Sequence, residues 1–263
     1  MSIKLIASDI DGTLLPFGSN EIPKRSIDAI QKVIDRGIRF ILASGRQYHQ
    51  MRRFFSSVAD EIDYIAENGC LAYHNGKLIY RAAMSEDLSR EILETVLKIE
   101  NCEIVVSGEK SYYMNPRKMD LFEHIRDVDH AKIERVDSLF ELPEPCMKIS
   151  IFNDNRSADD LAYWRDRLSS KCTVQTSGHN LIDIVPPDVN KATALKKILE
   201  TLNISPEDVI AFGDNENDRE MLELVGCPIV MKISNPAIQS IGKFVTDNVA
   251  ISLEKFLEEE LKC

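Results

Sequence analysis

The chain has 263 residues, and its 43 acidic and 32 basic residues give it a net charge of −11 at pH 7. This length exceeds the commonest domain size of roughly 100–150 residues, so one large or two moderate domains are expected, and two are favoured. The negative charge opposes binding to nucleic-acid backbones and to anionic membrane surfaces. The composition therefore predicts no nucleic-acid partner and no membrane partner.

The N-terminal sequence MSIKLIASDIDGT has no long apolar segment before its acidic residues, and nowhere does the chain approach the ~20 apolar residues that span a bilayer. A cytoplasmic protein is therefore expected. No two cysteines form a C-x-x-C pair of the kind found in zinc knuckles and redox motifs. The cysteines, which we expect to be reduced thiols, are Cys70, Cys102, Cys146, Cys172, Cys227 and Cys263.

The first elements follow the order strand, helix, strand. Residues 3–10 form an apolar run without polar alternation, which predicts a strand buried on both faces of a parallel sheet. Apolar residues at helical spacing occupy 27–34, between Pro23 as a start signal and Gly37 as a stop signal. A second apolar run at 38–43 follows at once. This order predicts a right-handed βαβ unit and a parallel sheet.

The next segment, residues 62–82, contains two Asn-Gly pairs between short apolar stretches. These pairs are Asn68-Gly69 and Asn75-Gly76. Because both residues of such a pair readily adopt positive φ, the segment predicts hairpin turns.

Residues 83–185 have a different pattern and predict a separate α+β domain. Its expected helices are 86–99, 117–126 and 157–169, and its expected strands are 103–107, 111–114, 146–152, 172–176 and 181–185. The βαβ pattern then returns with helix 191–203, strand 208–212, helix 217–225, strand 228–231 and a last helix from about residue 250. The sequence thus predicts one α/β domain, residues 1–82 and 186–263, interrupted by the domain 83–185.

Asp9 and Asp11 lie two residues apart at the end of the first predicted strand, so their side chains leave an extended segment on the same side. Ligands of open parallel sheets bind at this edge. Two carboxylates so close repel each other unless a cation intervenes, and an oxygen-rich site suits Mg²⁺. An acidic turn with a capping Asp is the alternative interpretation.

Ser44 and Gly45 follow the second strand in the sequence Ala43-Ser44-Gly45-Arg46 and open a predicted helix. The free backbone N–H groups there could cradle a phosphate. A serine N-cap without any ligand would explain the same residues.

Lys191 opens the helix 191–203, where the helix dipole disfavours a positive charge. A nearby anion would compensate for this position. The alternative is a solvated lysine in a helix capped by Asn190.

The segment from Gly213 to Asp218 places three acids and two amides directly after a buried strand. Asp214 ends that strand, and Asn217 and Asp218 begin the next helix. Such a density of oxygen ligands after an apolar strand indicates a cation site, although a solvated acidic loop has the same composition.

Together, the motifs D-I-D-G-T-L, S-G-R, a helix-opening lysine and G-D-N-E-N-D resemble those of the haloacid dehalogenase-like hydrolases. The large insert between Ser44 and Lys191 is similar to the C2B-type cap of the Cof-like subgroup, and the resemblance spans essentially the whole chain. It implies a Rossmann-like parallel sheet with helices on both faces and an inserted α+β cap domain. It also implies a Mg²⁺-dependent phosphatase with an aspartyl-phosphate intermediate.

The resemblance implies a role for each matching residue. Asp9 matches the nucleophile, and Asp11 matches the general acid/base. The positions that match substrate and phosphate binding are Gly12, Ser44, Gly45, Lys191 and Asn217. The matching metal ligands are Asp9, Asp11 through its carbonyl, and Asp214, with Asp218 in a supporting position.

The chain departs from the family pattern at several loop positions. Asp188 and Ala192 stand where the family often has glycine, before and after the motif lysine. The family's G-N-A loop corresponds to Ile233-Ser234-Asn235-Pro236, and the segment before the final helix is shortened around 248–251. These changes remove no catalytic group, but they affect the expected loop geometry.

Three groups in the inserted domain are not assigned to chemistry. A solvated loop explains Asp127, Asp129 and His130 better than a metal cluster does. Packing within the cap explains Tyr112, Tyr113 and Met114 as well as a substrate pocket would. His179-Asn180, at a predicted hairpin turn, is a candidate for substrate specificity.

The expected function is hydrolysis of a small phosphorylated metabolite, either a sugar phosphate or a phosphorylated cofactor. A phosphomutase or phosphotransferase would use the same intermediate. A phosphorylation-controlled binding module is a third hypothesis, because receiver domains also place acids, a Ser/Thr and a lysine at strand ends. The sequence does not identify the substrate, the pathway or the oligomeric state.

Overall fold

The structure is a computed structural model that describes residues 3–99, 102–153, 158–176, 181–259 and 263. The chain divides into two compact units. The core unit comprises Met1–Tyr80 and Asn190–Cys263, and the cap unit comprises Arg81–Val189. The predicted class, an α/β fold with an inserted α+β domain, is confirmed.

The core unit is built on an eight-stranded sheet with the order β14-β13-β12-β1-β2-β3-β4-β5. Its strands are β1 (Leu5–Ser8), β2 (Arg39–Ala43), β3 (Asp63–Ala66), β4 (Leu71–His74), β5 (Lys77–Arg81), β12 (Val209–Gly213), β13 (Cys227–Met231) and β14 (Phe244–Thr246). The strands from β14 to β3 pair in parallel, and β4 pairs with β3 in the antiparallel direction. The central strands are apolar on both sides because helices cover both faces.

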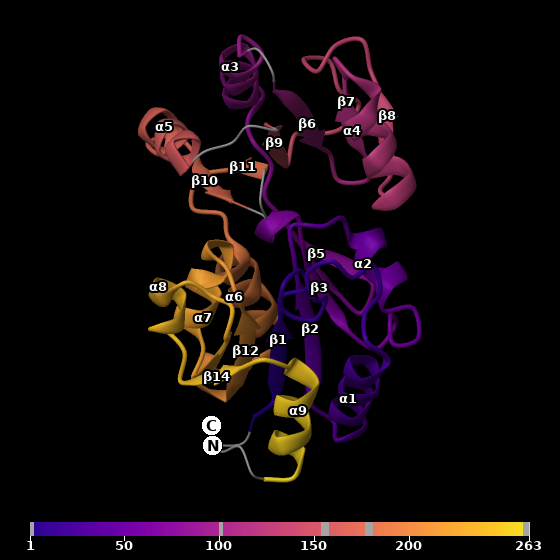
Figure 1. Ribbon diagram of the computed structural model, residues 1–263, viewed down its shortest axis with the longest axis vertical. Helices are drawn as coiled ribbons and strands as arrows, with labels where there is room; N and C mark the ends of the chain where they lie inside the picture. The colour runs from indigo at the N-terminus through magenta and orange to yellow at the C-terminus, as the bar shows by residue number, and fades with distance from the viewer. Residues whose placement is uncertain (1–2, 100–101, 154–157, 177–180, 260–262) are drawn as a thin grey trace. The chain divides into compact units, whose positions relative to one another are not determined.

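Helices lie on both faces of this sheet (Figure 1). One face carries α6 (Lys191–Leu202), α7 (Arg219–Leu224) and α8 (Pro236–Gln239), and the other carries α1 (Lys24–Asp35), α2 (Tyr48–Phe54) and α9 (Val249–Leu257). The apolar residues of α6 and α7 pack against alternate residues of β1, β2 and β12, such as Leu5, Ile41 and Val209. This continuous core fixes the positions of the strand ends.

The polar motifs lie at the carboxyl ends of three neighbouring strands. Strand β1 stands between β2 and β12, and its Ser8 pairs with Leu42 on one side and with Phe212 on the other. The segments that follow β1, β2 and β12 therefore leave the sheet at one edge. The chain reverses its direction of travel along the sheet at this point, where open α/β sheets bind their ligands.

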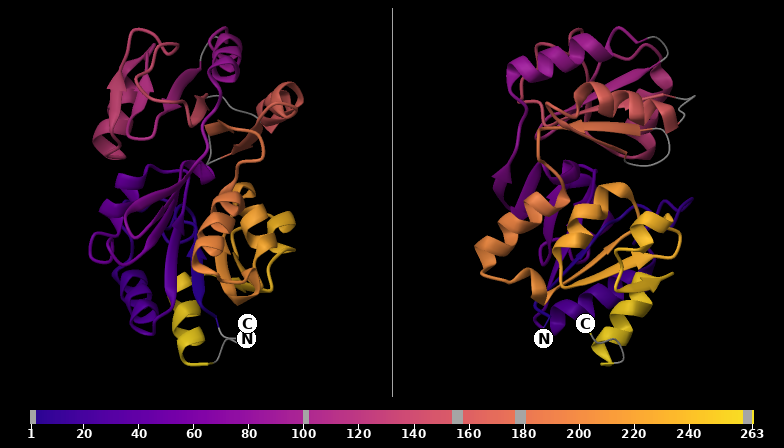
Figure 2. Two further views of the ribbon diagram at one scale, coloured as in Figure 1. Left: turned by 180° about the vertical axis from the view of Figure 1, so that it is seen from behind. Right: turned by 90° about the vertical axis from the view of Figure 1, so that its left-hand side faces the viewer.

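The cap unit contains a six-stranded sheet with the order β10-β11-β9-β6-β7-β8. Its strands are β6 (Glu103–Ser107), β7 (Tyr112–Met114), β8 (Ile133–Arg135), β9 (Lys148–Phe152), β10 (Thr173–Thr176) and β11 (Leu181–Val185). Helices α3 (Glu86–Val96) and α5 (Ala158–Leu168) cover one face (Figure 2). Their apolar residues, including Leu93 and Trp164, pack on Ile104, Val106 and Ile149.

Some elements of the cap differ from the sequence prediction. The helix expected at 117–126 is α4 (Met119–Glu123) followed by a wide turn at His124–Val128 with π-helical hydrogen bonding. The three-residue strand β8 was not predicted, because Ile133–Arg135 is short and largely polar. Hydrogen bonds to the neighbouring strand β7 stabilise β8, although its own residues have little preference for a strand.

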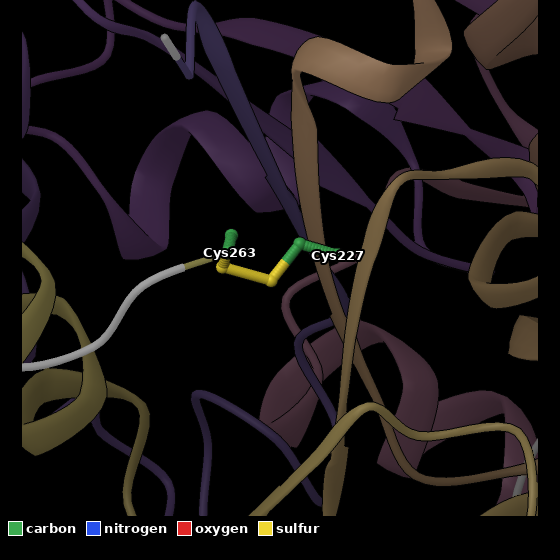
Figure 3. Close-up of a disulfide and its surroundings, with 2 residues drawn as sticks. All are labelled: Cys227 and Cys263. Carbon is green, nitrogen blue, oxygen red and sulfur yellow. A yellow bond between two sulfur atoms is a disulfide. The ribbon is translucent and has the colours of Figure 1, made fainter. Parts of the chain in front are cut away.

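The expectation that all cysteines are free thiols is wrong for one pair. Cys227, the first residue of β13, is bonded to Cys263 (Figure 3). The other four cysteines are buried and form no disulfide with a described residue. Cys227 and Cys263 are 36 residues apart in the sequence, and only the folded chain brings their sulfur atoms together. The sequence therefore contains no indication of this disulfide.

Serine at position 263 should lower the stability of the oxidised protein. A loop closed over 36 residues removes chain entropy that corresponds to about 4 kcal/mol of unfolding free energy. We therefore expect Cys263→Ser to lower the denaturation midpoint in the absence of reductant. In dithiothreitol the variant and the wild type should unfold together, and a difference that persists there would contradict this origin.

Among the described residues, no helix has the length and apolar character required to cross a bilayer.

Candidate active site

Asp9 lies directly after β1, and its carboxylate is bonded to Lys191. The backbone N–H of Asp9 donates to the carbonyl of Phe212, which extends the β1–β12 pairing by one residue. Lys191 Nζ donates to Asp9 Oδ1 at 2.6 Å. Only 1% of Lys191 and 5% of Asp9 are exposed, so this is an ion pair almost without water. Lys191 is therefore not the solvated lysine that its position at a helix start also allowed.

Asp218 is the second partner of Lys191. Its Oδ1 accepts from Lys191 Nζ at 2.6 Å, and its Oδ2 accepts from the backbone N–H groups of Asp214 and Asn215. Asp218 is fully buried, at 0% exposure. The carboxylate thus joins the loop after β12 to the first residue of α6 and holds both in place.

Asp214 completes a group of three carboxylates. Oxygen atoms of Asp9, Asp214 and Asp218 lie within 4.8 Å of one another. Asp214 Oδ1 accepts a hydrogen bond from Thr13 Oγ1 at 3.0 Å. In the part of the chain that the structure describes, no other group of His, Cys, Asp and Glu side chains meets the same criterion.

The protonation of this group reflects burial and mutual repulsion. Burial, followed by the charges of Asp218 and Asp214, raises the pKa of Asp9 well above its usual range, although Lys191 opposes this. Burial and the charge of Asp218 raise the pKa of Asp214 to about 7. Burial alone would lower the pKa of Lys191, but the two carboxylates bonded to it raise that pKa above its usual value. Three carboxylates facing one ammonium leave an excess of negative charge.

The donor set fits Mg²⁺. The cluster offers carboxylate oxygens alone, which are the ligands of a hard divalent cation, and a cation there would offset the remaining negative charge. The carbonyl of Asp11, which the sequence motif also assigns to the metal, stays a prediction.

Gly12 gives the acidic loop room to approach Asp214. Its φ is +85°, and a Cβ atom there would lie 2.5 Å from Asp214 Oδ2. Only glycine meets both conditions, because a side chain would be strained by the backbone and would displace a carboxylate of the cluster.

Alanine at position 12 should therefore impair the site itself. We expect Gly12→Ala to lower stability by roughly 1–3 kcal/mol and to raise the Mg²⁺ concentration needed for half-maximal activity. Gly18→Ala is the matched control, since Gly18 has φ +79° with nothing within 4 Å of the added Cβ. An unchanged Mg²⁺ requirement in Gly12→Ala would show that Asp214 is not displaced.

Ser44 lies in a tight turn directly after β2. Its backbone N–H donates to Ile65 and its carbonyl accepts from Asn68 N–H at 3.0 Å. The Ser44 hydroxyl accepts from the backbone N–H of Arg46 at 3.2 Å. A Cβ atom on Gly45 would lie 3.1 Å from the Asn68 side chain, so the turn and Asn68 are closely packed.

Asn68 is a site residue that the sequence prediction missed. The Asn68-Gly69 pair was assigned to a hairpin turn, and it does have positive φ in the short turn η1 (Glu67–Gly69) between β3 and β4. The Asn68 side chain is completely buried and accepts from Asn217 Nδ2 at 3.1 Å. It thus connects the Ser44 turn with the loop after β12.

The turn η1 needs glycine at position 69 because the backbone of Asn190 lies very close to it. A Cβ atom there would lie 2.1 Å from the carbonyl oxygen of Asn190, the N-cap of α6. The Asn190 side chain accepts from Thr193 N–H, as the sequence predicted for this cap. The close approach brings the start of α6, and with it Lys191, beside the turn.

Asp11 is separate from the carboxylate group. Its two carboxylate oxygens accept from Arg46, from Nε at 2.9 Å and from the terminal nitrogen at 2.8 Å. Its side chain is 46% exposed. Asp11 and Asp9 therefore have different environments, one partly in solvent and one buried.

The residues that differ from the family pattern have identifiable roles. Asp188 has φ +60°, a conformation that explains why glycine is frequent there and that Asp also tolerates. Ala192 is buried in the core under the sheet. Asn235 caps α8 through Ile238 N–H and also bonds to Glu216 on the loop after β12. Asn248 caps α9 in the shortened segment.

The structure explains two of the three groups of cap residues that the sequence left unassigned. Tyr113 and Met114 are buried in the two apolar clusters of the cap, and Asp127 is exposed and paired with Arg126, so packing and a solvated loop explain them. His179-Asn180 lies outside the described residues.

Comparison with known proteins identifies the family of the chain. The sequence model of the haloacid dehalogenase-like hydrolase family matches residues 6–252. The 5-amino-6-(5-phospho-D-ribitylamino)uracil phosphatase YbjI of Escherichia coli is 30% identical over 245 residues, which are 93% of this chain and 90% of that protein.

Two solved structures are similar along their whole length. SMU.1108c from Streptococcus mutans has a TM-score of 0.87 at 25% identity and covers 98% of this chain and 100% of its own. A structure from Eubacterium rectale has a TM-score of 0.84 at 25% identity and covers 97% and 99%. The chain therefore belongs to the haloacid dehalogenase-like hydrolases.

Proposed function

We propose that the chain is a Mg²⁺-dependent phosphatase that hydrolyses a small phosphorylated metabolite through an aspartyl-phosphate on Asp9. The observation that carries the proposal is the pair of 2.6 Å bonds from Lys191 Nζ to Asp9 and Asp218, made beside the carboxylate of Asp214. The Asp9 carboxylate and the substrate phosphate are both negatively charged, so a fixed ammonium beside them favours the attack of one on the other.

The residues that would hold Mg²⁺ are Asp9 and Asp214, with the Asp11 carbonyl as a third candidate and Asp218 beside them in a supporting position. When bound, the ion neutralises the repulsion between the Asp9 carboxylate and the phosphate dianion. Asp218 already accepts from Lys191 and two backbone N–H groups, so its main contribution is to hold the loop and the lysine in place.

Asp9 is the nucleophile of the proposed reaction. One of its oxygens attacks phosphorus as the bond to the leaving oxygen breaks, which gives an acyl phosphate. The bond from Lys191 to Oδ1 fixes the carboxylate in one orientation, so little conformational freedom is lost when the substrate arrives. Burial excludes the water that would otherwise solvate the carboxylate.

Asp11 is the proposed general acid and base. It donates a proton to the leaving oxygen in the first step and takes a proton from the water that attacks the acyl phosphate in the second. Its partial exposure suits a group that exchanges protons with water. The separation of Asp11 from the buried group gives the two acids different tasks.

The Ser44 turn and Lys191 are the proposed binding groups for the transferring phosphoryl. The hydroxyl of Ser44 and the ammonium of Lys191 are donors for the equatorial oxygens, where charge collects in the transition state. The backbone N–H groups of Ser44 and Arg46, which the sequence left free for a phosphate, instead donate to the Ile65 carbonyl and the Ser44 hydroxyl. Asn217 and Asn68 support this arrangement through their 3.1 Å bond.

A small phosphorylated metabolite is the proposed substrate class. The related YbjI protein is named for a phosphorylated ribitylaminouracil, a soluble metabolite of this kind. The net charge of −11 disfavours polyanionic substrates such as nucleic acids.

Phosphate release should require both Mg²⁺ and a low-molecular-weight ester. We expect the purified protein to release phosphate from p-nitrophenyl phosphate with Mg²⁺ and to lose this activity in EDTA, with recovery when excess Mg²⁺ is added. A panel of sugar phosphates and phosphorylated cofactors then ranks substrates by kcat/KM. Full activity in EDTA would contradict the metal requirement, and transfer to an added sugar hydroxyl faster than to water would identify a phosphotransferase.

A further inference from the structure

Arg46 and Asp11 form a two-pronged ion pair at the edge of the site. The two nitrogens of the guanidinium donate to the two oxygens of the carboxylate at 2.9 and 2.8 Å. This parallel geometry fixes the plane of the carboxylate as well as its distance, which a single point charge would not do. Both residues belong to the core unit.

The backbone of Arg46 is anchored in the Ser44 turn. Its N–H donates to Ser44 Oγ at 3.2 Å, and its carbonyl accepts from Glu67 N–H at 3.2 Å. The guanidinium also lies over the Phe54 ring, with its central carbon 5.1 Å from the ring centre. One residue therefore couples the turn proposed to bind phosphate to the carboxylate proposed to move the proton.

Stability alone does not explain this arrangement. Asp11 is 46% exposed and Arg46 is 21% exposed, and ion pairs of such exposure contribute about 0–1 kcal/mol to stability. The geometry is nevertheless fixed at four points: two carboxylate oxygens, the Ser44 hydroxyl and the Phe54 ring. Its effect is therefore on the orientation of Asp11 rather than on folding.

We propose that Arg46 is a positioning residue that aims Asp11 at the leaving oxygen of the substrate. The inference rests on the proposed function, in which Asp11 is the general acid and base. When the P–O bond breaks, its electron pair goes to the leaving oxygen, which takes the proton from one Asp11 oxygen while the other oxygen stays bonded to Arg46. The carboxylate that remains then accepts both guanidinium bonds, as in this structure, and next takes a proton from the attacking water.

The proposal predicts a dependence on the leaving group. Phenolate is a much stronger base than p-nitrophenolate, so phenyl phosphate needs the acid far more than p-nitrophenyl phosphate does, although the two esters are alike in size. The ratio kcat/KM covers only the steps up to the first irreversible one, the transfer of phosphoryl to Asp9. Loss of Asp11 alignment should therefore lower kcat/KM for phenyl phosphate at least tenfold and for p-nitrophenyl phosphate threefold or less.

The experiment compares Arg46→Ala, Asp11→Asn and the double variant on both esters. Arg46→Ala should show the same leaving-group dependence as Asp11→Asn, and the double variant should match Asp11→Asn, because a residue that acts through Asp11 has no effect without it. Arg46→Lys keeps the charge but not the fork, so it should recover only part of the lost activity.

Arg52→Ala is the matched control. Arg52 lies on α2, the helix that follows Arg46 in the chain; it pairs with Asp60 at 2.6 Å and stacks over Tyr48, but its partner carboxylate has no part in the site. Its loss should leave both kcat/KM values unchanged.

Three outcomes would overturn the proposal. They are an equal loss on both esters in Arg46→Ala, a further loss in the double variant, and full recovery by lysine. Each concerns Arg46 alone, because the wild type would still hydrolyse both esters. If the wild type itself hydrolyses neither ester with Mg²⁺, the proposed function fails instead.

Discussion

Replacing Asp9 with asparagine is expected to reduce kcat for p-nitrophenyl phosphate by roughly 10⁴–10⁶-fold, the effect of removing a nucleophile that acts together with its neighbours. The amide has the shape of the carboxylate but does not attack phosphorus. The loss should appear in single-turnover experiments as the absence of a phosphorylated protein, detected by mass. Asparagine also removes a negative charge from a crowded group in which burial has raised the pKa of Asp9, so the variant should stay folded.

The controls separate chemistry from folding. Asp28→Asn, at an exposed position of α1 that is paired with Lys24, should keep full activity. Circular dichroism and the thermal midpoint should show that Asp9→Asn is folded. A variant that hydrolyses the ester at the wild-type rate would remove the basis of the proposed function.

Replacing Lys191 with methionine should affect stability and activity together. Methionine fills a similar space but leaves the buried carboxylates of Asp9 and Asp218 without their counter-ion. Breaking a buried pair in this way costs about 3–5 kcal/mol. The transferring phosphoryl also loses its proposed ammonium, so we expect a fall in kcat of at least 10²–10³-fold, comparable to the loss of one oxyanion donor.

Mg²⁺ should restore part of the thermal stability that Lys191→Met loses. Because the methionine variant has an uncompensated negative group, Mg²⁺ should raise its thermal midpoint more than that of the wild type, while activity stays low. Lys197→Met is the matched control on the same helix, since Lys197 is exposed and pairs only with Glu200 among the described residues. Equal midpoints for Lys191→Met and the wild type without Mg²⁺ would show that the ion pair does not stabilise the fold.

Several features of the site follow from the sequence because they depend on strand ends. A short apolar run followed by acids or serine predicts where a parallel strand stops, and the βαβ rule brings the ends of successive strands to one edge. Asp9 and Asp214 were placed in this way, and the register of β1 with β12 makes them neighbours. The helix start at Lys191 was also predictable from Asn190 before it.

Other contacts depend on distances that no local pattern contains. The sequence indicated a supporting position for Asp218, but not that Asp218 is the buried partner of Lys191, 27 residues away. Asn68 looked like a hairpin residue, and its bond to Asn217 spans 149 positions. The sequence signal that could have found Asn68 is the Asn-Gly pair shortly after the apolar stretch 64–66, at the edge where ligands are expected.

The cap shows the limit of periodicity in another way. Long apolar strands such as Lys148–Phe152 were found because alternate residues face the two helices above them. The three-residue strands β8 and β14 were missed, because three residues are too few to show a period of two. Strand β7 is equally short but was found, because its two tyrosines favour a strand. The bond between Cys227 and Cys263 was missed for a similar reason, since cysteine spacing alone does not reveal pairing.

The position of β1 between β2 and β12 has a consequence for biosynthesis. One edge of β1 pairs with a strand only about 34 residues further on, whereas the other waits for a strand 204 residues away, as the Leu5 pairings with Arg39 and Val209 show. A ribosome at ~5–20 residues per second needs roughly 10–40 s to synthesise that stretch. Throughout this time one edge of the largely apolar strand β1 stays unpaired in the nascent chain, and such an edge is the kind of surface that chaperones bind and that aggregates recruit.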